Sequence, residues 1–432
     1  MQEIGLGLLG FGTVGAGVVE GLQRNGDLIA ARAGVRPVLR KIADLDLDRD
    51  RGVVVDRSML TTDATAVIHD PEIHIVIELI GGVGIARELV MEALKAGKPV
   101  VTANKKLLAE FGHELFPLAD QHQVDLRFEA SVAGGIPIIQ ALREGLIANH
   151  IPNAYGILNG TCNYILTRME EEGRPFDEVL QEAQDAGYAE AEPSLDIDGH
   201  DTAHKAALLA SLAYGFPYPL SRLHVEGIRG IAREDIENVC ELGYRMKLLA
   251  ILKKTGDQVG VRVHPTLVPL DHMLAQVGGV FNTVMVTGDI VGDTLYYGKG
   301  AGRLPTASAV ISDIAAIARQ LATQSSGHVP AFVPEGGQPQ IQPMDEVLAR
   351  NYLRLSLMDR PGVLAHVAGI LGEHGISIET MVQKSRSRET YVPVILITHQ
   401  AQEKNMREAV ARLNESEHVG SKPVRFRIED FA

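Results

Sequence analysis

Four acidic side chains crowd the ten residues that precede a predicted helix carrying a lysine. The stretch EPSLDIDGHDTAHK, residues 192–205, contains Glu192, Asp196, Asp198 and Asp201 and ends four positions later at Lys205. Clustered carboxylates repel one another, so this segment requires a cationic partner. A metal ion, a lysine or the ammonium group of a substrate would each serve. The composition therefore predicts a site that binds positive charge.

The spacing of Asp201 and Lys205 places both on one face of the helix TAHKAALLASLAYG, with Asp201 expected at its N-cap. The helix N-terminus disfavours an ammonium group, whereas the neighbouring carboxylates favour it. Such opposed influences are typical of a tuned proton donor. A solvated surface lysine is the alternative that the residues alone leave open.

A second chemical signal lies at the start of the chain, where GFGTVG follows the strand-like run IGLGLL and opens a helix-like run. Glycines at this spacing allow a tight turn, a close approach of backbone to a pyrophosphate, and close packing of helix on strand. The pattern predicts dinucleotide binding. The residues expected to contact the cofactor are Gly10, Phe11, Gly12, Thr13, Val14 and Gly15.

The end of the second predicted strand, RKIADLD, bears on the choice of cofactor. Asp44 would accept a hydrogen bond from the ribose 2′-hydroxyl and favours NAD, whereas Arg40 and Lys41 would suit the 2′-phosphate of NADP. Both cofactors remain open. Lys105 directly follows the strand-like VVTAN, at an edge from which an ammonium group reaches cofactor or substrate.

The alternation of apolar runs predicts the helices and strands that position these residues. Short strand-like runs interleaved with longer helical ones predict an α/β fold with a Rossmann-type dinucleotide-binding domain. A second, mixed α/β domain follows, and a β-α-β-β-α-β order near the carboxyl end predicts a ferredoxin-like domain. The expected boundaries are 1–133, then 134–303, a linker at 324–349, and 350–432.

Composition narrows the class of protein. The chain has 432 residues and a net charge of −14 without a basic stripe, which argues against nucleic-acid binding. Its apolar runs are shorter than a membrane span requires, and its amino terminus has no basic region of a signal peptide, so a cytoplasmic protein is expected. Cys162 and Cys240 lack the spacing of a disulfide framework or a zinc site.

Seven ordered motifs then resemble the homoserine dehydrogenases that carry a carboxy-terminal ACT domain. They are GLLGFGTVG, VTANKKLLA, FEASVAGGIPII, GILNGTCNYILT, GYAEAEPSLDIDGHDTAHK, GKGAGRLPTASAV and DRPGVLAHVAGILGEHGISIE. The resemblance implies interconversion of L-homoserine and L-aspartate 4-semialdehyde with NAD or NADP. It implies that Lys205 donates and accepts the proton, with Lys105 a second catalytic lysine. Glu190 and Asp201 would bind substrate, supported by Asp196.

The same resemblance implies that the mixed α/β domain is a substrate-binding and dimerisation domain, and that the first domain is completed by the helix 304–323. It also implies further ligands. Glu129 and the backbone carbonyls of Val132, Gly134 and Ile136 would bind a monovalent cation, with Na⁺ expected, and Gly187 and Gly302 would approach the cofactor. The ACT domain would bind L-threonine and inhibit an enzyme of threonine and methionine biosynthesis, acting as a homodimer or homotetramer. Glu192 stands where the family commonly has Asp, which leaves its role open.

Two other functions compete with this interpretation. An aldehyde dehydrogenase that forms acyl phosphates would need a thiolate, and Cys162 in NGTCNY would supply it, although no His or Lys lies next to it in sequence. An amino-acid sensor with a vestigial nucleotide fold would show damaged catalytic positions, whereas Lys105, Glu190, Asp201 and Lys205 are all present. For the carboxy-terminal domain, the alternative to threonine binding is a dimerisation module without a ligand.

Overall fold

The computed structural model describes residues 1–323, 329–334, 337, 339–383 and 391–431. Part of the predicted linker and the segment 384–390 lie outside these residues. The chain divides into two compact units, each built from three segments. The first unit comprises Met1–Gly160, Asp201–Leu223 and Val280–Pro339, and the second comprises Thr161–His200, His224–Gly279 and Gln340–Ala432.

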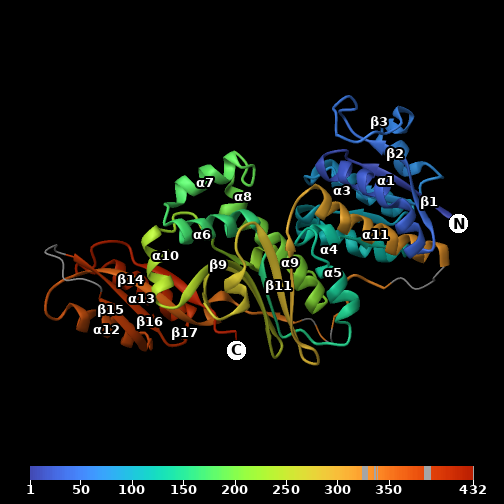
Figure 1. The fold of residues 1–432 in the computed structure, drawn as a ribbon. Coiled ribbons are helices and arrows are strands. Elements are labelled where there is room, and N and C mark those ends of the chain that lie inside the picture. The colour runs from blue at the N-terminus through green and yellow to red at the C-terminus, as the bar shows by residue number, and fades with distance from the viewer. Residues whose placement is uncertain (324–328, 335–336, 338, 384–390, 432) are drawn as a thin grey trace. The chain divides into compact units, whose positions relative to one another are not determined.

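A parallel sheet forms the centre of the first unit, with the strand order β3-β2-β1-β4-β5-β6 (Figure 1). Because β4 pairs with β1 on the side away from β2, the winding reverses between them, and ligands bind beyond the carboxyl ends of the strands at such a point. The predicted doubly wound sheet is confirmed. Its strands are β1 (Glu3–Leu9), β2 (Arg36–Ala43), β3 (Leu60–Thr61), β4 (Ile75–Glu78), β5 (Val100–Thr102) and β6 (Leu126–Arg127).

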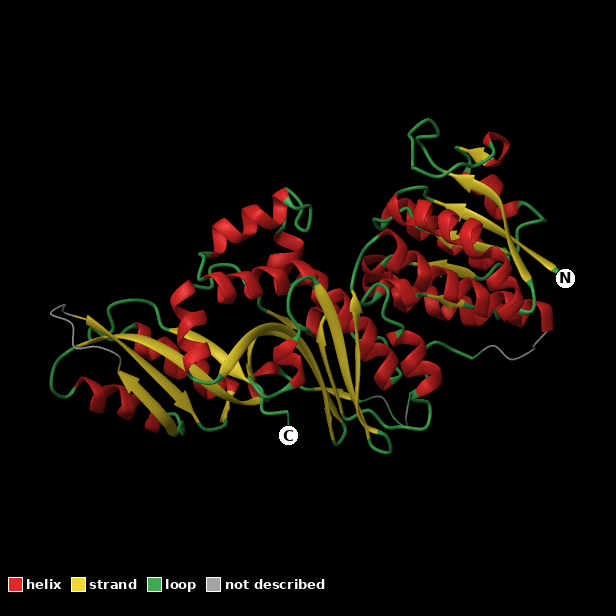
Figure 2. Ribbon diagram, viewed as in Figure 1, coloured by secondary structure: helices red, strands yellow, loops and turns green. Residues whose placement is uncertain are grey.

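Helices cover this sheet (Figure 2). The residues of β1 beyond Glu3 are all buried, as expected for a strand covered on both faces. One core joins β1 and β4 to α1 and α11, and a side chain at Gly17 of α1 would lie 2.6 Å from the Arg303 carbonyl oxygen, so only glycine permits this approach. The helices are α1 (Thr13–Ala33), α2 (Ala64–His69), α3 (Gly84–Lys95), α4 (Lys105–His122) and α11 (Arg303–Thr323).

The first unit also contains an antiparallel group of strands, β12-β11-β7, in which β11 pairs with both neighbours. The lysine-bearing helix α9 belongs to this unit from Asp201 onward. These elements are β7 (Asn153–Ile157), β11 (Phe281–Gly288), β12 (Gly292–Lys299), α5 (Ile138–Gln140) and α9 (His200–Tyr214).

The second unit joins a long hairpin, β9 and β10, to the carboxy-terminal module, whose β18 pairs in parallel with β10. The order β14-α12-β15-β16-α13-β18 confirms the predicted ferredoxin-like topology. The strands are β8 (His224–Val225), β9 (Tyr244–Thr255), β10 (Gln258–Pro269), β13 (Gln340–Ile341), β14 (Leu348–Met358), β15 (Ile378–Gln383), β16 (Tyr391–Thr398), β17 (Ala401–Gln402) and β18 (Val424–Ile428). The helices are α6 (Gly160–Glu172), α7 (Phe176–Asp185), α8 (Ser194–Ile197), α10 (Arg233–Glu241), α12 (Val363–Glu373) and α13 (Glu403–Asn414).

Two segments contain short regular elements. In the acidic segment, Ser194–Ile197 forms α8, and the Pro193 carbonyl oxygen accepts hydrogen bonds from the Asp196 and Ile197 N–H groups. Within the predicted linker, β13 pairs with β10.

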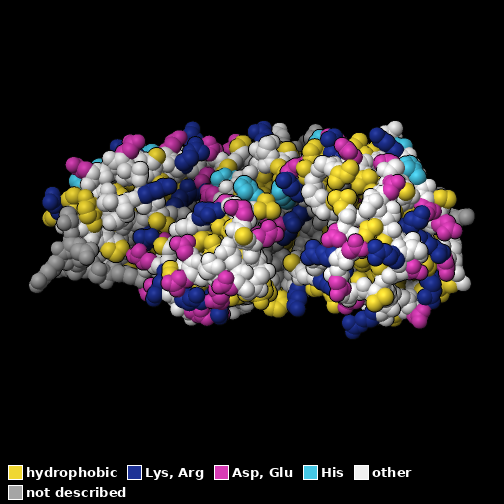
Figure 3. All heavy atoms as spheres, turned by 90° about the horizontal axis from the view of Figure 1, so that it is seen from above, with side chains coloured by type: hydrophobic (Ala, Val, Ile, Leu, Met, Phe, Trp, Pro, Cys, Tyr) yellow, Lys and Arg dark blue, Asp and Glu magenta, His cyan; other side chains and the backbone are white. Residues whose placement is uncertain are grey.

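Charged side chains of both signs are interspersed on the face seen in Figure 3. On that face, the acidic side chains therefore do not form one continuous negative patch. In the part of the chain that the structure describes, no helix is both long enough and apolar enough to cross a membrane.

Candidate active site

The turn after β1 has the geometry that the glycine spacing predicts. Gly10 has a φ of 96° and donates its N–H to the Ala43 carbonyl oxygen at 2.8 Å. A side chain at Gly15 would overlap the Gly10 carbonyl oxygen, whereas one at Gly12 would meet no atom within 4 Å. Gly12 therefore faces open space at the N-terminus of α1, where the free N–H groups of a helix stabilise a phosphate.

Two cavities open beside this turn. One has a volume of about 700 Å³ and is lined by Gly10, Gly12 and Asp44, together with residues of the β2, α2 and β4 ends. The other, of about 380 Å³, contains Thr13 in its lining. Phe11 and Val14 are buried or half-buried and join the core, so their contribution to a ligand would come from the backbone.

Asp44 lies at the rim of both cavities. Its Oδ2 accepts a hydrogen bond from the Phe11 N–H at 2.6 Å, and its Oδ1 lies 3.2 Å from Arg51 Nη2. Arg51 also donates Nε–H to the Phe11 carbonyl oxygen. The carboxylate thus holds the glycine turn in place while Asp44 lines both cavities.

The basic residues near this site differ from those that the sequence indicated. Arg40 pairs with Glu3 at 2.7 Å and Lys41 pairs with Asp70 at 2.8 Å, and neither lines the cavities. The smaller cavity is instead lined by three guanidinium groups that sequence reasoning missed, those of Arg49, Arg51 and Arg303. The run DLDLDRDRG was the available signal for the first two.

Lys205, Asp201 and Lys105 meet in one buried cluster. Lys205 Nζ lies 2.6 Å from Asp201 Oδ2 and donates to the Leu158 carbonyl oxygen at 2.7 Å. Lys105 Nζ lies 3.2 Å from Asp201 Oδ1. Lys205 is only 8% exposed and Asp201 4%, so neither is the solvated surface residue that the sequence left open. Since α9 begins at His200, Asp201 is its second residue and lies in the first turn, two positions after the N-cap position where it was predicted to lie.

The electrostatics of Asp201 follow from its two cationic neighbours. Burial alone would raise the pKa of Asp201, but the charges of Lys205 and Lys105 outweigh burial and hold that pKa well below its usual range. Hydrogen bonds from Lys205 and from Asn159 Nδ2, at 2.9 Å, act in the same direction. Asp201 is therefore a permanent carboxylate that fixes two ammonium groups.

Lys105 is positioned by polar residues that sequence reasoning did not single out. Asn104 caps α4 by accepting a hydrogen bond from the Leu107 N–H at 3.1 Å. Its own N–H donates to Thr102 Oγ1, which donates to Glu78 Oε2 at 2.6 Å. Glu78 is fully buried, and its Oε1 accepts from the Ile80 and Gly81 N–H groups. The ends of β4 and β5 are thereby held together below the crevice.

The other acidic residues lie in the second unit. Asp198 pairs with Arg229 at 2.8 Å, a hydrogen bond that lowers the pKa of Asp198, and Glu192 accepts a hydrogen bond from the Ser194 N–H at 3.2 Å. Arg229 is a counter-charge that the sequence did not reveal. The Glu190 carboxylate is exposed and makes no hydrogen bond or ion pair within the described residues. Asp196 lies at the end of α8, half-buried.

The turn around Glu129 brings oxygen atoms together. Glu129 is 2% exposed, and its two carboxylate oxygens accept hydrogen bonds from the Ile139 and Gln140 N–H groups at 2.8 and 2.7 Å. Burial, together with the charge of Asp313, raises the pKa of Glu129 to about 7. Each oxygen keeps a lone pair, because a carboxylate accepts about four hydrogen bonds in all.

The backbone after Glu129 is strongly bent. Ala133 and Gly134 have φ values of 54° and 55°, and a side chain at Gly134 would overlap the Gly300 carbonyl oxygen. Val132 and Ile136 are buried on either side. One carboxylate and turn carbonyls form a hard oxygen donor set, which suits a cation of low charge. Among the described residues, no group of three or more His, Cys, Asp or Glu side chains is arranged for a metal ion.

The remaining sequence candidates are also placed. Gly302 precedes α11 with a φ of 122°, and Gly187 in the second unit has a φ of 75° in an exposed turn. Cys162 is fully buried and donates Sγ–H to the Asp196 carbonyl oxygen at 3.2 Å. A buried thiol in that arrangement is not an accessible nucleophile.

Comparison with known proteins gives consistent matches along the chain. Residues 10–129 match the family model described as "Homoserine dehydrogenase, NAD binding domain", residues 137–315 match "Homoserine dehydrogenase", and residues 351–415 match "ACT domain". The chain is 45% identical to a homoserine dehydrogenase of Neisseria gonorrhoeae over 98% of both chains. It superimposes with a TM-score of 0.95 on the crystal structure of a homoserine dehydrogenase from Thiobacillus denitrificans, at 47% identity, covering 100% of this chain and 99% of that one. A hyperthermophilic archaeal homoserine dehydrogenase in complex with NADPH matches 72% of this chain and 97% of its own, at 28% identity and a TM-score of 0.61.

Proposed function

The chain belongs to the homoserine dehydrogenase family, a family of oxidoreductases, and we propose that it interconverts L-homoserine and L-aspartate 4-semialdehyde with Lys205 as proton donor and acceptor. The observation that carries this proposal is the position of the Lys205 ammonium group. Two of its three N–H bonds are directed to Asp201 and to the Leu158 carbonyl oxygen. The third is left for the substrate oxygen.

The nicotinamide cofactor, when bound, supplies hydride transfer to and from the substrate carbon. The chain's own contribution is the proton. In the reducing direction, the Lys205 ammonium donates a proton to the carbonyl oxygen, and in the oxidising direction the neutral amine accepts the hydroxyl proton. Asp201 holds Lys205 in place and stabilises its charged form. Lys105, 34% exposed in its side chain, provides a second positive charge near the substrate.

The acidic residues of the second unit would bind the amino-acid end of the substrate. Glu190 is exposed and without a counter-charge within the described residues, so it is available for the α-ammonium group of homoserine. Asp196 would support it. Glu192 and Asp198 bind Ser194 and Arg229, which favours structural roles for both.

The cavities beside the GxGxxG turn would hold the cofactor. The larger one suits the adenosine and pyrophosphate groups, and Gly302 and Gly187 would approach the nicotinamide end. The residues present fit NAD and NADP alike, because Asp44 can accept from a ribose hydroxyl and Arg49 can pair with a 2′-phosphate. The NADPH complex of the archaeal relative supports the use of NAD(P).

A monovalent cation, with Na⁺ expected, would bind Glu129 and the carbonyls of Val132, Gly134 and Ile136. The buried carboxylate with unused lone pairs supports this site, since one negative charge with neutral oxygens matches a monovalent ion. A cation there would fix the turn that packs against Gly300. Its contribution would be structural, as no reacting group lies in the donor set.

The ACT domain supports regulation by an amino acid, and we propose L-threonine as the effector of an enzyme in threonine and methionine biosynthesis. A homodimer or homotetramer would bring paired ACT modules together. The domain boundaries proposed from sequence, 1–133 with 304–323, 134–303, 324–349 and 350–432, remain the assignment to test by expressing the separate parts.

Initial-rate assays test the proposed function. Purified protein should reduce NAD or NADP with L-homoserine and oxidise the reduced cofactor with L-aspartate 4-semialdehyde. Millimolar L-threonine should slow both directions, and L-valine serves as a control amino acid. Absence of turnover with both cofactors would refute the substrate assignment, and turnover indifferent to threonine would refute the effector.

A further inference from the structure

A buried asparagine outside the lysine cluster shares the backbone oxygen that anchors Lys205. Asn282, in β11, is 1% exposed and donates Nδ2–H to the Leu158 carbonyl oxygen at 2.9 Å. The same oxygen accepts the hydrogen bond from Lys205 Nζ at 2.7 Å. One carbonyl thus joins the lysine to the asparagine, so a shift of either partner is transmitted to the other.

The rest of the Asn282 amide is poorly satisfied. Its Oδ1 is buried and has no hydrogen-bond partner among the described residues. A buried acceptor without a partner costs stability, and an apolar side chain of similar size would avoid that cost. Stability therefore does not explain an amide at this position. A functional requirement for the one hydrogen bond to Leu158 does explain it.

The surroundings of Asn282 fix its orientation. A side chain at Gly300 would overlap the amide group, and one at Gly160 would lie 3.6 Å from Oδ1. Gly300 belongs to the loop that ends at Gly302 before α11, and Gly160 follows Asn159, a partner of Asp201. The amide is enclosed by glycines on two sides, so it has little freedom to turn away from Leu158.

We propose that Asn282 is a positioning residue that sets the direction of the free Lys205 N–H through the Leu158 carbonyl. An ammonium group has three N–H bonds at fixed angles, so the positions of Asp201 Oδ2 and the Leu158 oxygen determine where the third one points. Asn282 keeps the Leu158 oxygen in place. This inference rests on the proposed role of Lys205.

The inference predicts a shift in the pH profile that a residue with a merely structural role would not cause. The Asn282 hydrogen bond uses electron density of the Leu158 oxygen, which weakens that oxygen as an acceptor for the ammonium. Without Asn282 the charged lysine is better stabilised, and oxidation of homoserine requires the neutral amine. The acid limb of the pH profile for kcat/KM should therefore move to higher pH by about 0.5 unit.

The experiment compares Asn282→Ala and Asn282→Asp with Thr283→Val, a matched control. Thr283 is the adjacent residue of β11, is also fully buried, and also donates to a carbonyl oxygen, that of Tyr296 at 2.8 Å. We expect N282A to lower kcat by about tenfold to a hundredfold, as misdirection of a catalytic group does, with KM for the cofactor unchanged. T283V should keep kcat and the pH profile.

N282D retains the shape of asparagine and serves if N282A does not fold. The introduced carboxylate cannot donate a hydrogen bond to the Leu158 oxygen, and it adds a negative charge near Lys205. The acid limb of the N282D pH profile should therefore lie at a higher pH than that of N282A. A kcat within twofold of the parent, or an unshifted acid limb in every folded variant, overturns the inference. K205M separates a failure of the Lys205 proposal from a failure of the Asn282 inference. An active K205M refutes the proposed role of Lys205. An inactive K205M together with a normal N282A or N282D refutes only the role of Asn282.

Discussion

Lys205 and Asp201 lie one turn apart on α9, with Nζ 2.6 Å from Oδ2, and Lys105 Nζ lies 3.2 Å from the other oxygen of the same carboxylate. One buried acid therefore serves two lysines that come from different parts of the chain. The arrangement distinguishes the buried Lys205, 8% exposed, from Lys105, whose side chain is 34% exposed.

Replacement of Lys205 by Met should remove the proton transfer and leave the fold intact. We expect kcat to fall by about 10²–10⁴ in both directions, the range that general acid–base catalysis contributes. Cofactor binding, measured by fluorescence titration of the reduced nicotinamide, should remain. Lys106→Met is the matched control, because Lys106 lies beside Lys105 but is half exposed and pairs with Glu110 at 3.9 Å. A K205M enzyme that keeps a tenth of its kcat would contradict the assignment.

Replacement of Asp201 by Asn should move the pH profile the other way from the Asn282 variants. Without the carboxylate the charged form of Lys205 loses its main stabilisation, so the acid limb of homoserine oxidation should shift to lower pH by about 1 unit or more. The melting temperature should also fall, since two buried or half-buried lysines lose their counter-charge. Asp198→Asn is the control, because Asp198 binds Arg229 in the second unit. Equal shifts in both variants would show that the effect is not specific to the lysine pair.

Much of this site follows from local sequence patterns. The four-residue spacing of Asp201 and Lys205 survives a two-residue error in the helix start, because both remain on one face. The glycine turn was predictable because Gly10 is required by its positive φ and Gly15 by close packing, while Gly12 leaves open space at the start of α1. The alternation of strands and helices gave the sheet and the ferredoxin-like module for the same reason.

The residues that were missed act through distant partners. The Leu158 oxygen, Asn282 and Glu78 have no sequence signal, because a backbone carbonyl or a buried amide is indistinguishable from its neighbours until the fold brings the partners together. Arg40 and Lys41 were sequence candidates for a 2′-phosphate, but they pair with Glu3 and Asp70. These partners lie on other strands or loops, so the local sequence does not reveal them. Periodicity describes one element at a time, whereas these contacts join several.

The choice between NAD and NADP should depend on Arg49. Arg49 lines the smaller cavity with Arg51 and Arg303, but its guanidinium makes no ion pair within the described residues, so it is available for a 2′-phosphate. Arg49→Ala should raise KM for NADP by about tenfold, the loss of one charge-assisted hydrogen bond, and leave KM for NAD unchanged. Arg57→Ala is the control, because Arg57 is exposed and pairs with Asp48. Equal effects on the two cofactors would contradict this role.

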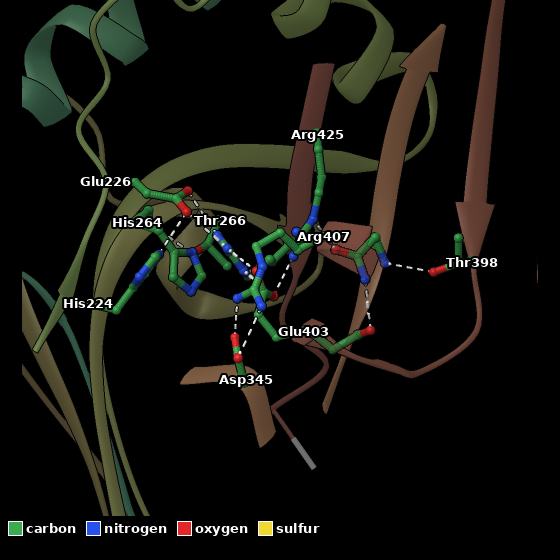
Figure 4. A network of polar contacts seen from close by, with 12 residues as sticks. His224, Glu226, His264, Thr266, Asp345, Thr398, Glu403, Arg407 and Arg425 are labelled. Atoms are coloured by element: carbon green, nitrogen blue, oxygen red, sulfur yellow. Dashed lines mark hydrogen bonds and ion pairs between the residues drawn. The ribbon is translucent and has the colours of Figure 1, made fainter. Parts of the chain in front are cut away.

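The stability of the second unit should depend on pH through the network around Arg427. Arg427 binds Glu226 through two hydrogen bonds of 2.9 Å and also binds Glu403. Glu226 and Glu403 are both seen in the polar network of Figure 4. Burial would raise the pKa of Glu226, but hydrogen bonds from His224 and Arg427 hold it well below its usual range. Because the folded-state pKa is the lower one, the stabilisation is present above the unfolded value, near 4.5, and is lost as pH falls below it.

Glu226→Gln should accordingly lower the melting temperature at pH 7 by about 2–4 °C, and the difference from the parent should shrink toward pH 3. Asp345→Asn is the control in the same view, since Asp345 forms an exposed pair with Arg407 and such pairs contribute little (Figure 4). Differential scanning fluorimetry from pH 3 to 8 measures both. A constant difference over that range would mean that Glu226 acts through packing rather than charge.

A cation at Glu129 should be visible as ligand-dependent stability, independent of turnover. The folded turn supplies the buried carboxylate and carbonyls, whereas the unfolded chain does not, so binding must raise the melting temperature as the ion concentration rises above its Kd. We expect NaCl to stabilise the protein more than choline chloride at equal ionic strength. Glu129→Gln should abolish that difference, because it removes the negative charge. Its single amide oxygen can accept from only one of the Ile139 and Gln140 N–H groups, so the variant is compared between the two salts rather than with the parent. Glu144→Gln, at an exposed acid of the same region, should keep it. Identical melting in the two salts would refute the cation site and leave Glu129 as the acceptor that caps α5.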